Sequence, residues 1–459
     1  MYDYAIIGSG PSGGLLAHHL HNSGANCVLI EAGKLYRKNT FPENEADYSA
    51  QLYWGGGMEF DQQAKMVFLR SKAVGGTSIV NQCLMDRFDD IAFNDWNKKS
   101  NIDFFTPEKM APYYEKVENH VQPHTFSEKE LNTNAKKFLQ GCDAMGYRWD
   151  YLHRGQTDCC LEKGNDCIGC LGGCYRDSKQ SSLVSYIQPA EKKGLKIISE
   201  FNVETIEHNV EHVVINGTIN GTKNQVTAKK IILACGSLGT TQILLRSGFK
   251  KKLPALGKNF SCHPQFMTFG IYDQPIDAHK GAFQTVASKD PSFRTRGFKL
   301  ENVFAPPISV AMLFDVFGKE HQQLMKKYRY LSCIEVAVRD EETGEITIDK
   351  KGKLIVKKEL TERDKKRRDD GLQVVKNIME KSGAKQVFQS GFYFGLHLMG
   401  GCSIGTNPEK SVVDPEFKVH GFKNIFIADS SIFPMAPGIN PSLTIMALSE
   451  KLSEQLLKK

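Results

Sequence analysis

The chain has 459 residues, 41% of them hydrophobic and 24% charged, which predicts a soluble globular protein of two or three domains. Its 59 basic and 52 acidic residues give a net charge of +7, and the basic ones are concentrated in 349–368 rather than along an element that could read a nucleic acid, so we expect no nucleic-acid partner. The longest apolar stretch, 303–314, is shorter than the roughly 18 residues of a membrane span, so we expect no transmembrane helix.

The first thirty residues predict a strand, a glycine-rich turn, a helix and a second strand. Residues 2–7 (YDYAII) are apolar and β-branched, 11–21 have helical composition, and 25–30 form a second apolar run that ends in Glu31. The sequence G-S-G-P-S-G separates the first strand from the helix. This combination is the fingerprint of a βαβ unit that binds a dinucleotide.

Each residue of the fingerprint has a distinct task. Gly8 permits the tight turn, Gly10 lets the backbone approach a pyrophosphate, and Gly13 lets helix and strand pack closely. The helix N-terminus offers unpaired N–H groups to the phosphates. Glu31 can accept a hydrogen bond from a ribose hydroxyl, and no arginine beside it favours a 2′-phosphate, so NADP is the least expected ligand. The unit alone leaves NAD and FAD open.

The next segments combine loops and helices. Residues 70–81 contain two glycines followed by small hydroxyl residues, which can wrap a cofactor closely or form a plain turn. Residues 107–121 predict an amphipathic helix with Thr106 as N-cap, and 128–146 predict another. A cysteine-rich loop, 159–174, follows.

The middle of the chain returns to the nucleotide domain. We expect 181–187 and 195–199 to be extended and 202–237 to be rich in strands. The last of these strands, 230–234, leads through a glycine into a helix, a step typical of a parallel sheet whose carboxyl ends face a ligand.

Residues 265–395 change character. Phenylalanine is frequent, alternating patterns recur near 331–338 and 344–356, and 361–381 predict a helix. We interpret this region as a mostly antiparallel sheet in a separate lobe that could offer an apolar substrate surface, or whose aromatic residues simply form its core. The basic stretch falls here as a solvated hairpin and helix face; contact with acidic lipid or an acidic partner is the alternative.

The last sixty residues carry a second group of signals. His397 lies among glycines, and a buried strand, 424–428, ends in Asp429. Asn440 and Pro441 have the pattern of an N-cap and a first helical residue, followed by a helix to about 457. Both His397 and Asn440 therefore have structural explanations when each is taken alone.

Five stretches in this order resemble the glucose–methanol–choline (GMC) family of flavin oxidoreductases. They are 8–13 with Glu31, 70–81 (RSKAVGGTSIVN), 233–237 (LACGS), 256–264 (LGKNFSCHP), and the segment from 397–401 (HLMGG) through Asp429 to 440–444 (NPSLT). The resemblance spans the whole chain and implies FAD as the nucleotide.

The resemblance also implies which residues hold FAD. The ADP half would be held by Gly8, Gly10, Ser12, Gly13 and Glu31, with Val203 at the adenine; the pyrophosphate and flavin would be lined by Gly75, Gly76, Thr77 and Asn81; Asp429 would meet the ribityl–phosphate region, and the helix at Pro441 would point at the flavin.

The family's catalytic pair corresponds to His397 and Asn440, the His/Asn subtype. A neutral histidine suits removal of a hydroxyl proton while hydride leaves the same carbon, and an asparagine can orient the hydroxyl. We therefore expect His397 to act as base and Asn440 as substrate orienter.

The cysteine-rich loop has three open interpretations. Its five cysteines are Cys159, Cys160, Cys167, Cys170 and Cys174. The spacing C-x2-C-x3-C is close to a ferredoxin run, but position 164 is glycine and Tyr175 stands where proline is usual. An iron–sulfur cluster, a zinc site, and thiols or disulfides that staple the loop are the alternatives.

These observations predict an α/β protein. It has a Rossmann-like FAD-binding domain built from 1–90, 185–264 and 396–459, and a discontinuous second lobe, an antiparallel sheet with helices, built from 91–184 and 265–395. No signal peptide is expected before the first strand, and we predict a cytoplasmic protein, with a location at the inner face of the membrane as the alternative.

The expected activity is FAD-dependent oxidation of a fairly apolar alcohol to an aldehyde or ketone, by a dehydrogenase whose electron acceptor is a protein or a quinone. The alternatives are an alcohol or sterol oxidase that uses oxygen, and a flavoprotein of this fold that acts as a lyase, a photoenzyme or an electron-transfer subunit.

Overall fold

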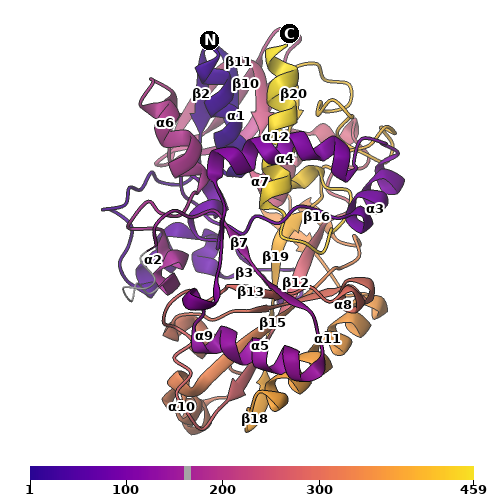
Figure 1. Ribbon diagram of the computed structural model, residues 1–459. Coiled ribbons are helices and arrows are strands. Elements are labelled where there is room, and N and C mark those ends of the chain that lie inside the picture. Colours follow the sequence, from indigo (N-terminus) through magenta and orange to yellow (C-terminus); the bar gives the residue numbers. More distant parts are fainter. Residues whose placement is uncertain (160–166, 459) are drawn as a thin grey trace.

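A computed structural model describes residues 1–159 and 167–458. Figure 1 shows two regions, one that contains both termini and one at the opposite end of the molecule. The first is built on a sheet whose strands follow the order β8-β2-β1-β11-β10-β9, with β20 beside β11. The strands are β1 (Tyr2–Ile7), β2 (Cys27–Ile30), β8 (Lys196–Ile198), β9 (Phe201–His208), β10 (Val213–Ile219), β11 (Thr222–Leu233) and β20 (Ile425–Ile427).

The predicted βαβ unit is confirmed. Strand β1 runs parallel to β2 and β11, β8 is parallel to β2, and β20 is parallel to β11. The helices of this region are α1 (Pro11–Asn22), α6 (Gln188–Glu191), α7 (Gly236–Arg246) and α12 (Ser442–Leu457). Helix α12 packs along α1, so the two ends of the chain lie side by side (Figure 1). The parallel strands end together, where a ligand is expected.

The second region is built on the sheet β3-β4-β19-β12-β15-β14-β13-β6, with β18 beside β12. Its strands are β3 (Glu59–Phe60), β4 (Met66–Phe68), β6 (Trp149–Tyr151), β12 (Ser261–Ile271), β13 (Val286–Ser288), β14 (Phe298–Asn302), β15 (Leu331–Val338), β18 (Gln386–Gln389) and β19 (Tyr393–Met399). Most pairs are antiparallel, as predicted; β19 and β4 are parallel. The division of the chain into domains stays a prediction.

The two faces of this sheet have different partners. Helices α5 (Thr133–Met145) and α11 (Glu362–Lys381) pack on one face, over a core that contains Phe266, Leu300 and Ile334 (Figure 1). Because side chains alternate along a strand, the neighbouring residues Met267, Glu301 and Glu335 belong to the other face. That face is turned toward the site described below.

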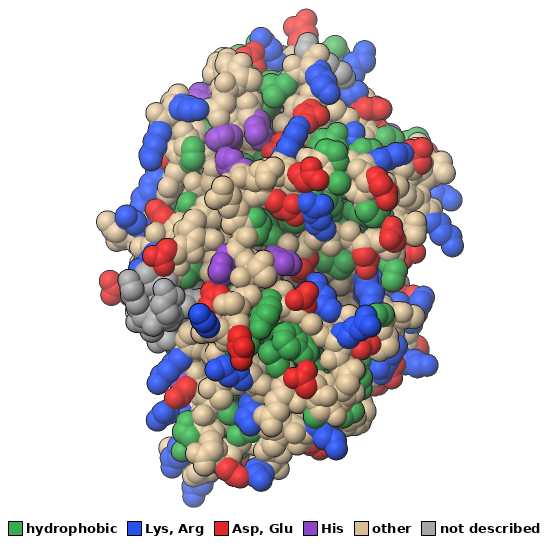
Figure 2. All heavy atoms as spheres, in the orientation of Figure 1, with side chains coloured by type: hydrophobic (Ala, Val, Ile, Leu, Met, Phe, Trp, Pro, Cys, Tyr) green, Lys and Arg blue, Asp and Glu red, His purple; other side chains and the backbone are tan. Residues whose placement is uncertain are grey.

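The remaining elements connect or cover these sheets. They are α2 (Glu45–Leu52), α3 (Asp90–Ser100), α4 (Pro107–Val121), α8 (Pro291–Arg296), α9 (Pro307–Leu313), α10 (Gly318–Lys326), the pair β5 (His124–Thr125) and β7 (His153–Arg154), and the hairpin β16 (Glu345–Ile348) and β17 (Leu354–Lys357). Across the described ranges, no helix combines the length and the apolar character that a bilayer crossing needs. Figure 2 shows acidic and basic side chains interspersed over the face drawn.

Two helix predictions are confirmed and two local predictions are wrong. Helix α4 starts after the N-cap Thr106, and α11 spans the predicted 361–381 to within a residue. Residues 181–187 are not extended: Leu183–Ile187 form a π-helical turn, because a short buried apolar run fits either structure. Asn440 is not an N-cap; α12 begins at Ser442 with Pro441 as its cap residue.

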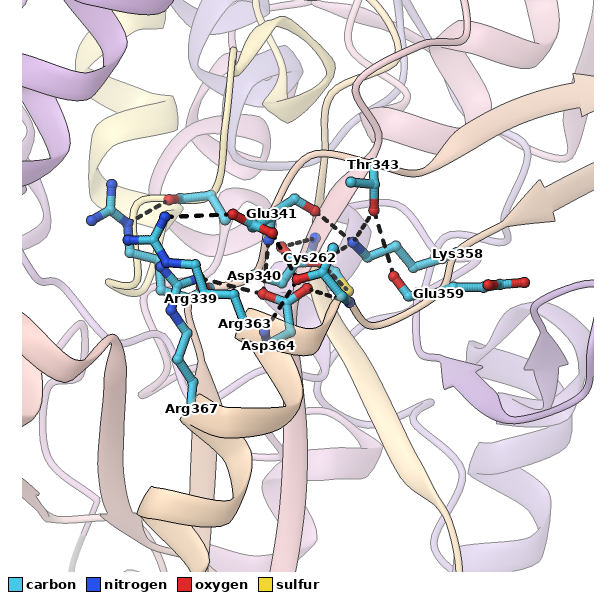
Figure 3. A network of polar contacts seen from close by, with 12 residues as sticks. Cys262, Arg339, Asp340, Glu341, Thr343, Lys358, Glu359, Arg363, Asp364 and Arg367 are labelled. Atoms are coloured by element: carbon cyan, nitrogen blue, oxygen red, sulfur yellow. Dashed lines mark hydrogen bonds and ion pairs between the residues drawn. The ribbon is translucent and has the colours of Figure 1, made fainter.

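A buried polar network fixes the start of β12 (Figure 3). Lys358 and Asp340 form an ion pair of 2.6 Å whose side chains are fully buried. The other oxygen of Asp340 accepts a hydrogen bond from the backbone of Cys262 at 3.2 Å, and Lys358 also donates to the carbonyl of Glu341. The network joins β12 to the segments that follow β15 and β17. It therefore holds the backbone next to His263, a residue of the site.

Candidate active site

Ser9, which the fingerprint does not single out, connects the two nucleotide loops. Its backbone N–H and its hydroxyl both donate to Oε2 of Glu31, at 3.1 and 2.7 Å, and its Oγ accepts from the backbone of Gly75 at 2.9 Å. Gly33 donates to the other oxygen of Glu31. Burial raises the pKa of the Glu31 carboxyl. Glu31 thus lies at the end of β2 and is tied to the glycine turn, as the predicted ribose contact requires.

Two of the glycines let backbone segments approach each other closely, and a third borders open space. A side chain at Gly8 or Gly76 would collide with backbone, at 2.3 Å from the oxygen of Ala234 and 2.6 Å from the Cα of Gly10. Beside Gly10 itself the space is open. The hydroxyl of Ser12, in the first turn of α1, is buried and finds no hydrogen-bond partner among the described residues. An orphaned donor at a helix N-terminus next to open space fits a phosphate group.

Asp429 and Val203 lie at the same edge of the first sheet. Asp429 accepts from the backbone of Gly236 at 2.8 Å and from the hydroxyl of Thr240 at 2.5 Å, both at the start of α7, and burial raises the pKa of its carboxyl. Val203 is buried in β9, two residues after Phe201, whose N–H donates to the carbonyl of Glu31. Their contacts with a nucleotide stay predictions.

A buried lysine holds the second nucleotide loop. The ammonium of Lys179 donates to the carbonyls of Ile79, Asn81 and Cys170, at 2.7, 2.7 and 2.8 Å. The amide of Asn81 in turn lies 3.5 Å from the hydroxyl of Ser442, at the start of α12. The loop of the predicted flavin contacts is therefore bound to both the cysteine-rich loop and the last helix.

A cavity of about 310 Å³ lies where this loop, the start of α12 and the second sheet meet. Both His397 and Asn440 line it. Much of its wall is apolar, including Phe269, Phe283 and Phe304 from the phenylalanine-rich region. The two residues that the sequence predicts as catalytic, 43 positions apart in the chain, therefore share one mostly apolar cavity.

His397 forms a histidine pair with His263. Their Nδ1 atoms are 2.9 Å apart, and the N–H of Gly438 donates to Nε2 of His263 at 2.9 Å. Burial lowers the pKa of His263 well below its usual value and that of His397 to about 4, so both rings are neutral near pH 7. Neutral His263 then carries its proton on Nδ1 and donates to His397, whose own proton is on Nε2.

Asn440 is oriented by a lysine that the sequence did not indicate. Lys299 donates to Oδ1 of Asn440 at 2.9 Å and contacts Asp86 at 3.0 Å and Glu301 at 2.5 Å. These two carboxylates raise the pKa of Lys299 above its usual value despite its burial. With Oδ1 engaged, the amide N–H groups of Asn440 are the atoms left for another partner. Pro441 places this residue at the entry of α12 without donating to a ligand itself.

The predicted cysteine ligands are described in part. The structure describes the side chains of Cys159, Cys170 and Cys174; Cys160 and the side chain of Cys167 lie outside the described residues. The sulfur of Cys159 is 3.1 Å from Oγ of Ser178, and a hydrogen bond with Cys170 together with burial raises the pKa of the Cys174 thiol. Within the described part of the chain, no three metal-ligating side chains gather. The cluster stays a prediction.

Comparison with known proteins decides the family. The sequence model named GMC oxidoreductase matches residues 49–265 with its N-terminal part and residues 340–449 with its C-terminal part, which together exceed half of the chain. The chain belongs to the GMC oxidoreductase family. Family membership makes the protein an oxidoreductase. FAD is the cofactor typical of the family, and it fits the open space beside Gly10 and the unpaired hydroxyl of Ser12.

Individual relatives are distant but cover the whole chain. An uncharacterized GMC-type oxidoreductase of Sinorhizobium fredii is 25% identical over 99% of this chain and 94% of its own length. The long-chain-alcohol oxidase FAO4A of Arabidopsis thaliana is 23% identical over 97% of this chain and 67% of its own. The crystal structure of pyridoxine 4-oxidase from Mesorbium loti superposes with a TM-score of 0.76 at 15% identity, covering 100% of both chains. The last comparison confirms the predicted fold.

Proposed function

We propose that this GMC oxidoreductase oxidises an alcohol to an aldehyde or ketone with FAD as its cofactor. The observation that supports the proposal is the shared cavity, in which His397 and Asn440 adjoin the loop and the helix start expected to hold the flavin. A substrate oxygen placed there would meet a neutral imidazole and an amide. Bound FAD would supply the acceptor for the hydride that leaves the carbon.

FAD would be held by the residues of the first sheet. Gly8, Gly10, Ser12 and Gly13 offer backbone and hydroxyl donors to its phosphates at the start of α1, and Glu31 offers a carboxylate to its ribose. The second loop, with Gly75 to Asn81, approaches the same cradle, since Gly75 donates to Ser9. Val203 and Asp429 are proposed contacts of the adenine and of the ribityl–phosphate region.

His397 and Asn440 would handle the hydroxyl group. In the resting hydrogen-bond pattern, Nε2–H of His397 and the amide of Asn440 both present donors, which can bind the oxygen of the alcohol. To act as base at Nε2, His397 must carry its proton on Nδ1 and donate it in a hydrogen bond to Nδ1 of His263. His263 must then carry its own proton on Nε2, which gives up the hydrogen bond from Gly438. We place this tautomer exchange before proton removal. Orientation of the oxygen by Asn440 requires no exchange.

The alcohol is proposed to be apolar, because the cavity wall is mostly apolar and because a relative is named for long-chain alcohols. The electron acceptor has two candidates. The cysteine-rich loop favours a dehydrogenase that passes electrons to a protein or a quinone. The relatives that are named for an activity are oxidases, such as the long-chain-alcohol oxidase FAO4A, which favours an oxidase that uses oxygen. A cytoplasmic location, with or without peripheral membrane contact, also stays a proposal.

The decisive experiment mixes the purified flavoprotein with primary alcohols of increasing chain length in the absence of oxygen. We expect the flavin absorbance to bleach, and we expect His397→Ala and Asn440→Ala to retain FAD but bleach at least about a hundredfold more slowly. Bleaching by no alcohol, or unchanged rates in both variants, would overturn the proposal. Admitting oxygen afterwards separates the two acceptors, since an oxidase recovers its colour at once and releases peroxide.

A further inference from the structure

The cavity face of the second sheet carries an acidic pair that the chemistry above does not use. Glu335 in β15 stands directly opposite Glu301 in β14, and opposite Met267 in β12 on its other side. Residues directly opposite in an antiparallel pair have side chains in contact on the same face. Both carboxyl groups are buried, with 1% exposure for Glu301 and 4% for Glu335. Glu335 lines the cavity of the candidate active site.

The two carboxyl groups cannot both be ionised at low cost. Their shared neighbour Lys299 is already in contact with Asp86 and Glu301, and Lys289, 3.8 Å from Asp86, is half exposed. The three carboxyl groups of Asp86, Glu301 and Glu335 thus outnumber Lys299 and the half-exposed Lys289 together, so an ionised Glu335 would add a negative charge that neither lysine balances. Burial, together with its hydrogen bond and charge repulsion from Glu301, raises the pKa of Glu335 well above its usual value. Burial and the neighbouring Glu301 therefore favour the protonated form of Glu335.

Glu335 offers an acceptor to the cavity that it lines. Glu301 accepts a hydrogen bond from Gln284 with one oxygen and contacts Lys299 with the other. The hydrogen bond between Glu335 and Glu301, one of the causes of the raised pKa of Glu335, leaves the second oxygen of Glu335 for the cavity. A carbonyl oxygen at the wall of a cavity accepts a hydrogen bond from whatever fills the cavity.

A second acceptor lies one step away on the same face. Gln265 in β12 is two residues from Met267 and so is the diagonal neighbour of Glu335, within reach of one small molecular group. Its amide oxygen is buried and finds no partner in the described part of the chain. Gln265 also lines the cavity, and Phe269 and Cys333, which follow Met267 and Glu335 on this face, are apolar. The sheet thus presents two acceptors next to apolar side chains.

We propose that Glu335 and Gln265 form a subsite that binds a second hydrogen-bond donor, an O–H or N–H group, on the alcohol that is oxidised. The inference rests on the proposed function, because the same cavity holds His397 and Asn440. It narrows the substrate from an apolar alcohol to one with an apolar body and a donor group distant from the reacting hydroxyl. A substrate without that group makes no hydrogen bond to either acceptor, which weakens its binding relative to a substrate whose donor satisfies one of them.

The test compares matched substrates that differ only in the far group. The probes are 1-hexanol, 1-octanol and 1-decanol, the α,ω-diols of the same lengths, and the corresponding ω-methoxy alcohols, which carry an oxygen but no donor. For the length that spans the cavity, we expect kcat/KM of the diol to exceed that of the alkanol by about tenfold after division by two for its equivalent ends. The methoxy alcohol should resemble the alkanol.

Two variants of one position assign the preference to Glu335. In Glu335→Gln, the carbonyl faces the cavity and the amide N–H faces Glu301, so the diol preference should persist. In Glu335→Leu one of the two acceptors is gone and only Gln265 remains, so the ratio of diol to alkanol should fall several-fold toward one. Met267→Leu, on the same face, is the control and should keep the ratio.

The outcomes separate this inference from the function on which it rests. If no alcohol in the panel bleaches the flavin, the proposed function fails. If alkanols and diols bleach it with equal kcat/KM at every length, or if Glu335→Gln loses the preference together with Glu335→Leu, the subsite is refuted and the function stands. If Glu335→Leu does not fold, the Glu335→Gln ratio and the methoxy series still decide.

Discussion

His263 is expected to act on catalysis through its partner ring and on stability through Gly438, and two substitutions separate these effects. In His263→Asn the side-chain amide occupies the place of Nδ1, so the contact with His397 survives and the bond to Gly438 is lost. In His263→Gln the amide reaches the place of Nε2, so the bond to Gly438 survives and the contact with His397 is lost. Neither residue introduces a charge.

The magnitudes follow from the two hydrogen bonds. A donor left without a partner costs about 1–3 kcal/mol when it is buried, and Gly438 is partly buried, so His263→Asn should lower the free energy of unfolding by about 1 kcal/mol, at the low end of that range. The bond between the two imidazole rings contributes about 0.5–1.5 kcal/mol, which at most corresponds to a rate factor of about ten. His263→Gln should therefore reduce flavin about tenfold more slowly than the wild type, while His263→Asn keeps a rate within about threefold.

The assays are anaerobic stopped-flow reduction of the flavin and urea unfolding followed by fluorescence. We expect the more stable of the two variants, His263→Gln, to be the one whose flavin is reduced more slowly. This expectation is refuted if the rate follows stability in both variants, since His263 would then act only as packing. It is also refuted if His263→Gln keeps the wild-type rate, because orientation of His397 would not depend on its neighbour. FAD content, measured by absorbance, controls for cofactor loss.

Three further outcomes are expected. Lys358→Met leaves Asp340 buried without its cation and should cost about 3–5 kcal/mol in urea unfolding, most of which the double variant with Asp340→Leu should restore. Gly76→Ala should fold but bind FAD at least about tenfold more weakly in a flavin titration, because its Cβ would meet the backbone of the first glycine turn. The pKa values of His263 and His397 lie below those of histidine in the unfolded chain, so folding is not penalised by these residues above about pH 6.5. On acidification toward pH 4 the free energy of unfolding should fall by at most about 1.4 kcal/mol per pH unit for each histidine. Urea unfolding at a series of pH values should show a shallower fall in His397→Leu.

The parts of the site that the sequence predicts are those that depend on local chemistry. The glycine turn, the acid at the end of β2 and the N-cap Thr106 each follow from a few adjacent residues. The catalytic positions came from a resemblance that spans the chain, and the structure brings His397 and Asn440 to one cavity. Asn440 shows the limit of local patterns. Asn-Pro before a helix predicts an N-cap, but the side-chain oxygen of Asn440 accepts a hydrogen bond from Lys299 instead.

The residues that sequence patterns missed depend on strand register. Lys299 and Glu301 alternate with apolar residues in β14, and Glu335 is the single charged residue of β15; on a sheet with one solvated face, such side chains would lie in water. In this sheet α5 and α11 cover one face and the cavity adjoins the other. The charged residues therefore lie on the face next to the cavity and not in solvent. Only the pairing of Glu301 with Glu335 reveals that two carboxyl groups oppose each other. His263 belongs to the stretch 256–264 that resembles the family, but the sequence does not show that its ring contacts His397.

Two clusters of buried charged residues adjoin the second sheet, and the balance of charge within each indicates a different role. Lys358 and Asp340 balance each other in charge and are fully buried, which suits a structural joint. The group around Lys299 has more carboxyl groups than buried cations, adjoins a cavity and holds Asn440, one of the two proposed catalytic residues. An unbalanced buried charge is costly, and it persists in a structure where a ligand or a proton completes it. The excess carboxyl, Glu335, faces the cavity, where the donor of a substrate would complete it.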